Sequence, residues 1–164
     1  SLESMIQTLA FNARLPVLLG ASPFYQTPKA PIARGLTFAE EDFVRARLTA
    51  LAIETDHFVR DDIYTLFVTT RIINFLKGLE LDCSTDAASL LGRQWPHPRT
   101  QIGIELLARL WRDGRLYLWT REGMIENRRF RSELFRRVVL QAGEIGCQNG
   151  ARIVVSGFGS RVLG

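Results

Sequence analysis

The residues of this sequence best suited to binding chemistry are arginines, and they gather in one block of the chain. From residue 93 to residue 137 there are 11 arginines, no lysine and five acidic residues, which gives 11 − 5 = +6. Residues 1–92 hold 8 basic and 11 acidic residues, or −3, and the whole chain carries +4. The planar guanidinium group offers paired donors to phosphates and to guanine edges. The block therefore indicates a nucleic-acid ligand, while an acidic protein partner stays open.

A second group combines carboxylates with a histidine where two helices are expected to meet: Glu54, Asp56, His57, Asp61 and Asp62. Such residues can support metal-assisted hydrolysis or general acid–base catalysis. A site of that kind draws its residues from separate elements, whereas these are contiguous. We interpret Asp61 and Asp62 as capping charges of a helix. The sequence predicts no catalytic residue, no metal ligand and no cofactor, so we expect no enzyme activity.

The cysteines and the glycine-rich stretch give no further chemistry. Cys83 and Cys147 have no metal-ligand spacing, and without export features their thiols are expected to be free and buried. The segment 157–160 (Gly-Phe-Gly-Ser) follows a strand-like stretch, but neither a helix pattern nor a lysine follows it. We interpret it as a hairpin turn rather than a phosphate loop.

Composition limits the class of protein. At 164 residues and 46% hydrophobic residues, the chain can build a core and is not a disordered segment. No apolar run approaches the roughly 18 residues of a membrane span, and no secretory signal is recognised, so we expect a cytoplasmic protein, or a nuclear one if eukaryotic. Because the sequence starts without Met and stops in a strand-like stretch, we expect a fragment.

Hydrophobic periodicity predicts a mainly α fold with a small β component. Residues 1–36 are expected to form an N-terminal helix limited by Pro16, followed by a proline-rich loop. Residues 37–164 are expected to form a single helical domain, whose first helix covers 38–53 after a capping box at Thr37 and Glu40.

Within that domain, helical patterns cover residues 61–77, 86–91 (capped by Ser84 or Thr85) and 99–111. Strand patterns follow at 115–120 and 124–127. Beyond them, the sequence predicts a helix over 128–142, a strand at 153–155 and a hairpin that returns through 162–163.

The order of three helices and a two-stranded ribbon over residues 61–127 resembles the winged helix-turn-helix superfamily. The resemblance implies that the helix after the turn enters the major groove with its N-terminal end. It places bases or phosphates near that end, the phosphate backbone near its last turn, and a groove or phosphate near the wing. The two arginines that begin the next expected helix are included in the site. The site residues, in that order, are Arg99, Thr100, Gln101, Arg109, Arg112, Arg115, Arg121, Arg128 and Arg129.

The function expected from this resemblance is nucleic-acid binding of a regulatory, replication or mobile-element type, with DNA favoured over RNA. Four aromatic side chains could stack on bases: Trp95, Trp111, Tyr117 and Trp119. The alternative is an assembly module, a homodimer or part of a complex, in which the arginines meet an acidic protein.

Overall fold

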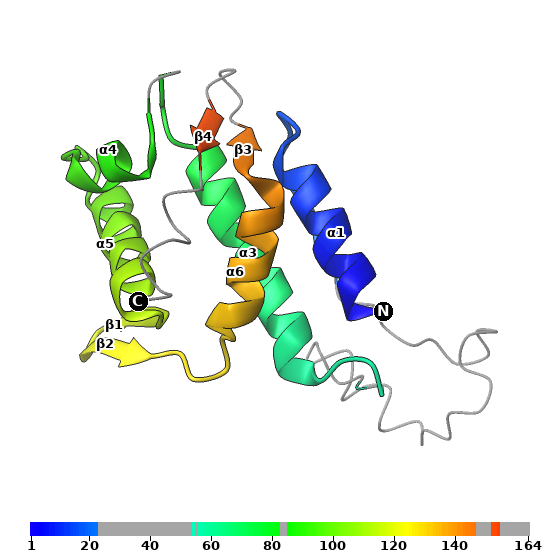
Figure 1. Cartoon of the computed structure of the whole chain (residues 1–164). Coiled ribbons are helices and arrows are strands. Elements are labelled where there is room, and N and C mark those ends of the chain that lie inside the picture. Colours follow the sequence, from blue (N-terminus) through cyan, green and yellow to red (C-terminus); the bar gives the residue numbers. More distant parts are fainter. Residues whose placement is uncertain (23–53, 55, 83–84, 147–151, 155–164) are drawn as a thin grey trace.

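The computed structural model describes residues 1–22, 54, 56–82, 85–146 and 152–154 (Figure 1). The described elements are α1 (Leu2–Ala13), α3 (Arg60–Lys77), α4 (Ala87–Gly92), α5 (Pro98–Asp113), β1 (Tyr117–Thr120), β2 (Gly123–Glu126), α6 (Ser132–Ala142), β3 (Glu144–Gly146) and β4 (Arg152–Val154). The fold is mainly helical with a small β component, as predicted. The predictions for 38–53, Cys83, Cys147, 157–160 and 162–163 lie outside the described residues.

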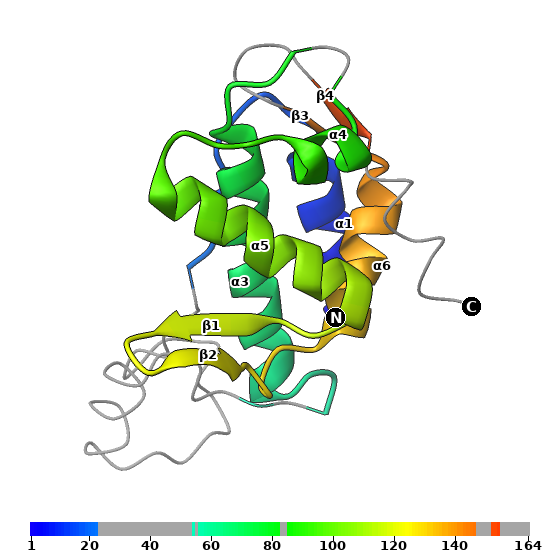
Figure 2. The ribbon, with the colours of Figure 1, turned by 90° about the vertical axis from the view of Figure 1, so that its left-hand side faces the viewer.

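Three helices form the body of the described structure. Helix α1 packs on α6 and α3, and α6 packs on α3 (Figure 1). Helices α4 and α5 lie on the other side of α3 from α1, and the β1–β2 hairpin runs back from the end of α5, below that helix in Figure 2. The buried apolar side chains of all five described helices belong to one core cluster. None of the described helices is long and apolar enough to cross a membrane.

The start of α3 confirms the capping interpretation for Asp62; Asp61 also lies in the first turn, where its carboxylate pairs with Arg129. The Asp62 carboxylate accepts a hydrogen bond from the Val59 amide at 2.9 Å, and Glu54 accepts one from the Arg60 amide at 3.0 Å. Carboxylates at this place satisfy free amides and complement the positive end of the helix dipole. In the described part of the chain, no cluster of three His, Cys, Asp or Glu side chains could hold a metal ion.

The chain after α1 is held on α3 by two polar side chains near the end of that helix. Lys77 is only 1% exposed, and its Nζ donates to the carbonyls of Asn12 (3.3 Å), Leu15 (2.8 Å) and Val17 (2.7 Å). Asn74 donates to the Leu19 carbonyl at 2.8 Å and accepts from the Leu19 amide at 2.7 Å. The periodicity predicts only that Lys77 ends a helix; it does not predict these hydrogen bonds to the chain after α1.

At the same end of the molecule, β3 passes very close to the chain that leaves α1. A Cβ built on Gly146 would lie 2.6 Å from the backbone oxygen of Arg14 and 3.2 Å from the backbone carbon of Leu15. Neighbouring backbone cannot rotate away as a side-chain tip can, so only glycine fits here.

We therefore expect Gly146→Ala to lower the free energy of unfolding by about 2 to 3 kcal/mol, in the upper range for overpacked sites. Urea denaturation followed by circular dichroism measures it. Gly92→Ala is the matched control, because a Cβ there meets no atom within 4 Å. Equal stability of the two variants would contradict the close approach of β3.

Two predicted helix boundaries were wrong. Helix α6 begins at Ser132 rather than 128, because the Arg131 amide donates to Thr65 Oγ1 (2.9 Å) on α3 instead of joining the helix. Helix α4 is capped by Asp86, whose Oδ1 accepts from the Ser89 amide at 2.7 Å, and not by residue 84 or 85.

Two further predictions were wrong, one about the strands and one about the buried face of α5. Residues 144–146, for which no strand was predicted, pair antiparallel with β4, so the 152–154 strand has a partner before it in the chain. The buried face of α5 is formed by Ile104, Leu107 and Leu110, whereas Ile102 and Leu106 are half-buried. The periodicity predicts Ile102, Leu106, Leu107, Leu110 and Trp111 on the inward face. Leu107 and Leu110 are buried as predicted and Trp111 packs on the core, but Ile104 is buried instead of Ile102 and Leu106.

Candidate nucleic-acid interface

Helix α5 is fixed against α3 by a close approach at Gly103. A Cβ at this residue would lie 2.6 Å from the tip of the Phe75 ring, so the missing side chain lets the two helices approach. The helix begins at Pro98, which suits the first turn because it lacks an amide proton there. His97 Nδ1 accepts from the Arg99 amide at 3.2 Å and so caps the start.

The β1–β2 hairpin is held at its base and at its turn. At the base, Leu116 is buried and its carbonyl accepts from the Asn127 amide at 2.8 Å, while Asn127 Nδ2 donates to the Tyr64 hydroxyl at 2.8 Å. At the turn, Thr120 Oγ1 donates to the Gly123 carbonyl at 2.8 Å. The hairpin is therefore anchored to α3 through its base.

Three of the nine predicted site residues are exposed arginines that make no ion pair within the described part of the chain. They are Arg99 in the first turn of α5, Arg121 in the hairpin turn and Arg128 in the loop after β2. No carboxylate of the described residues has to be displaced before a phosphate reaches these guanidinium groups. Arg109 is half-buried, and its guanidinium carbon lies 5.8 Å from the centre of the Tyr117 ring.

Three other predicted arginines are paired with carboxylates: Arg112 with Asp113 (2.9 Å), Arg115 with Glu126 (3.7 Å) and Arg129 with Asp61 (3.0 Å). The hydrogen bond from Arg112 lowers the pKa of Asp113. All three arginine side chains are more than half exposed, so solvent screens these ion pairs and they contribute little to stability. A phosphate can compete for such an arginine at small cost.

The two polar residues predicted to touch bases are less free. Gln101 is half-buried and its Oε1 accepts from the Trp95 amide at 3.1 Å, so its oxygen braces the turn before α5. Thr100 is half-buried in the first turn of α5. Gln101 can still donate its amide hydrogens to a ligand.

The elements that carry these residues lie on one side of the molecule. Helix α5 and the hairpin both lie on the side of the molecule that is turned toward the viewer in Figure 2. The start of α5 and the hairpin turn lie at the same edge of this side, on the left of the view. Helix α1 lies on the opposite side (Figure 1). Arg128 and Arg129 belong to the loop that leads from the hairpin to α6, where Arg129 also lies over Tyr64.

Among the four aromatic residues, Trp119 is the one left most open. Trp95 and Trp111 pack on the core, and Trp95 is also covered by Arg93. Tyr117 is covered by Arg109, whereas Trp119 is 51% exposed. The exposed Leu118 and Ile125 were not predicted as site residues; the signal for them was an apolar residue at every position from 116 to 119.

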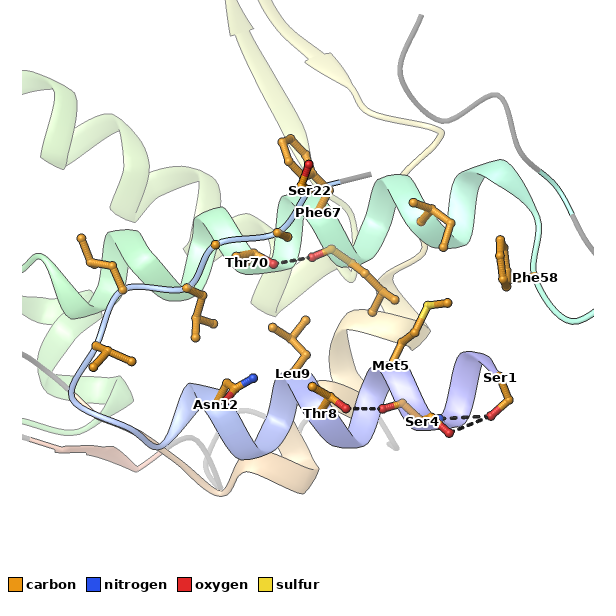
Figure 3. A pocket seen from close by; sticks show the side chains of 17 residues that line it. Ser1, Ser4, Met5, Thr8, Leu9, Asn12, Ser22, Phe58, Phe67 and Thr70 are labelled. Atoms are coloured by element: carbon orange, nitrogen blue, oxygen red, sulfur yellow. Dashed lines mark hydrogen bonds between the residues drawn. The ribbon is translucent and has the colours of Figure 1, made fainter. Parts of the chain in front are cut away.

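On the other side of the molecule, a groove runs between α1 and α3 (Figure 3). Its volume is about 680 Å³, and much of its lining is apolar, including Met5, Leu9, Val17 and Phe67. None of the nine predicted site residues lines it.

Comparison with protein-family models, with curated proteins and with solved structures found no significant match for this chain.

Proposed function

We propose that this chain is a nucleic-acid-binding domain in which α5 and the β1–β2 hairpin form the binding surface. The observation that carries the proposal is the set of exposed arginines without a carboxylate partner in the described structure, Arg99, Arg121 and Arg128. They lie in the first turn of a helix, in the turn of a ribbon and in the loop behind it. The N-terminal residues of a recognition helix contact base edges in helix-turn-helix proteins. We expect the ribbon turn and the loop behind it to reach the neighbouring phosphates.

The order of elements supports the winged-helix interpretation. A long helix (α3), a short helix (α4), a second long helix (α5) and an antiparallel hairpin follow one another directly. Helix α5 has 16 residues and is therefore about 24 Å long, enough to lie along a major groove. Its first turn would approach base edges while the hairpin approaches the next groove.

In this proposal the residues have different roles. Arg99 and Thr100 contact phosphates or bases from the start of α5, and Arg121 and Arg128 contact phosphates from the hairpin side. The paired arginines, Arg112, Arg115 and Arg129, add to the positive field and exchange a carboxylate for a phosphate when one comes near. Duplex DNA is favoured over RNA, because the deep, narrow major groove of A-form RNA does not admit a helix.

The proposal is tested by measuring the affinity of the whole chain for duplex DNA, single-stranded DNA and structured RNA over a range of salt concentrations. Each phosphate neutralised by an arginine releases counterions. The three arginines without a carboxylate partner among the described residues predict a slope of about −3 in a plot of log K against log salt for duplex DNA. Absence of binding to all three ligands at low salt rejects the proposal.

The second candidate function is an assembly module, and the α1–α3 groove favours it. Beside the groove, Phe11, Val17 and Leu18 are exposed, and contiguous apolar surface is typical of protein contact sites. On this view the paired and unpaired arginines meet an acidic protein. Light scattering separates the two: a monomer at high concentration that binds DNA supports the first function, and a stable oligomer without DNA binding supports the second.

A further inference from the structure

The β1–β2 hairpin exposes apolar side chains on both of its faces. Leu118 pairs across the strands with Ile125, and Trp119 pairs with Met124. Because neighbouring residues of a strand point to opposite faces, the Leu118–Ile125 pair and the Trp119–Met124 pair lie on different sides of the ribbon. Leu118, Trp119 and Ile125 are 47%, 51% and 50% exposed.

These exposed side chains are not what holds the hairpin in place. The base is held by buried Leu116 and by Asn127, which binds Leu116 and Tyr64, and the turn is held by Thr120. A two-stranded ribbon that carries surplus apolar surface beyond these anchors is better explained by a ligand than by its own stability.

The charges on the Trp119 face indicate the chemistry of that ligand. Tyr117 lies two residues before Trp119 and so on the same face, where Arg109 covers its ring and Arg115 pairs with Glu126, the cross-strand neighbour of Tyr117. Residues 109–131 as a whole hold seven arginines and three acidic residues, 7 − 3 = +4. An open indole on the same face of the ribbon as Tyr117, whose ring is covered by a guanidinium group, matches a ligand that has both a flat ring and a phosphate.

We propose that the hairpin binds unpaired nucleobases, with Trp119 stacked on a base and Arg109 and Arg115 near its phosphate. In a blunt duplex the faces of the bases are hidden by stacking, so this contact needs a single-stranded end or an opened step. The Leu118–Ile125 pair on the other face suits the neighbouring duplex end, as apolar wedges do where base steps are opened. The preferred ligand is a duplex with a single-stranded extension. This inference rests on the proposed nucleic-acid function.

The test compares a blunt duplex with the same duplex carrying a single-stranded extension, using fluorescence anisotropy with the whole chain. We expect tighter binding to the extended duplex. Trp119→Ala should weaken that binding by about 5- to 100-fold, because one stacked base is lost, and should leave the blunt duplex unchanged. Trp119→Phe should keep most of the affinity, and the tryptophan quenching caused by the extended duplex should disappear in this variant.

Leu140→Ala is the matched control, since Leu140 is equally exposed (51%) but lies on α6. Equal binding of both duplexes, unaffected by Trp119→Ala, overturns the inference while the proposed function stands. Loss of binding to every nucleic acid in the wild-type chain rejects the proposed function itself. If the wild-type chain self-associates and Trp119→Ala makes it monomeric, the hairpin is a protein interface, and the inference is overturned as well.

Discussion

The double variant Arg99→Glu/Arg121→Glu is expected to lose about 100-fold in affinity for duplex DNA, about tenfold from each position, if the two sites act independently. Both side chains are exposed, and neither has a carboxylate partner in the described structure. Each change therefore removes a phosphate contact without breaking an internal ion pair. The salt slope should also fall by about 1 for each position. Gel-shift or anisotropy titrations at several salt concentrations measure both quantities.

Arg14→Glu is the control for this result. It changes the net charge by the same amount as each single reversal, but Arg14 is exposed at the end of α1, on the opposite side from α5. If Arg14→Glu weakened binding as much as Arg99→Glu or Arg121→Glu, only the overall charge would matter, and the α5–hairpin surface would not be the binding site. Unchanged thermal unfolding in each variant shows that the fold is kept.

The second large effect is expected for Lys77→Met, with a loss of about 3 kcal/mol in the free energy of unfolding. Methionine fills much of the space of the lysine side chain but leaves the carbonyls of Asn12, Leu15 and Val17 without the ammonium donor. The Asn12 and Leu15 carbonyls keep backbone donors, the amides of Leu15 (3.1 Å) and Val17 (2.8 Å). The change still removes three hydrogen bonds from a charged donor, each worth about 1.5 to 3 kcal/mol, and this outweighs what is gained by no longer burying an ammonium group. Chemical denaturation followed by circular dichroism measures the loss.

Arg71→Met serves as the reference for Lys77→Met on the same helix. Arg71 is exposed and its guanidinium lies over the Phe67 ring, an interaction worth about 0.5 to 1 kcal/mol. A Lys77→Met variant as stable as Arg71→Met would show that the three carbonyls find other donors, and that the lysine is not what holds the chain after α1 on α3.

The sequence allowed the helices to be predicted wherever one face is continuously apolar. The spacing of apolar residues in the helix expected over 128–142 predicts five inward-facing side chains, and all five are buried: Phe130, Leu134, Phe135, Val138 and Val139. Where the boundary depends on a distant partner, the prediction was wrong. The start of α6 is set by Thr65, 66 positions away, and no local pattern contains that contact. The β3–β4 pair was missed because β3 is only three residues long.

The candidate site shows the same division between local and distant information. The excess of arginine in residues 93–137 was visible in the sequence, and so was the helix that begins before Arg99. Which arginines are paired could not be seen. Arg129 meets Asp61 across 68 positions, and Arg99 meets no carboxylate of the described structure. Burial of Lys77 was equally hidden, because the carbonyls that bind it lie 60 or more positions before it.

Helix α3 fixes the positions of both parts of the proposed surface, α5 and the hairpin. Gly103 seats α5 on the Phe75 ring, and Asn127 ties the hairpin to Tyr64, so both parts take their positions from one stiff rod rather than from the loops between them. The distance from the start of α5 to the hairpin is consequently set by the fold before any ligand binds. A ligand whose contact points have the same spacing binds to a preformed surface, so little affinity is lost to ordering the protein. A ligand with a different spacing cannot contact both parts at once.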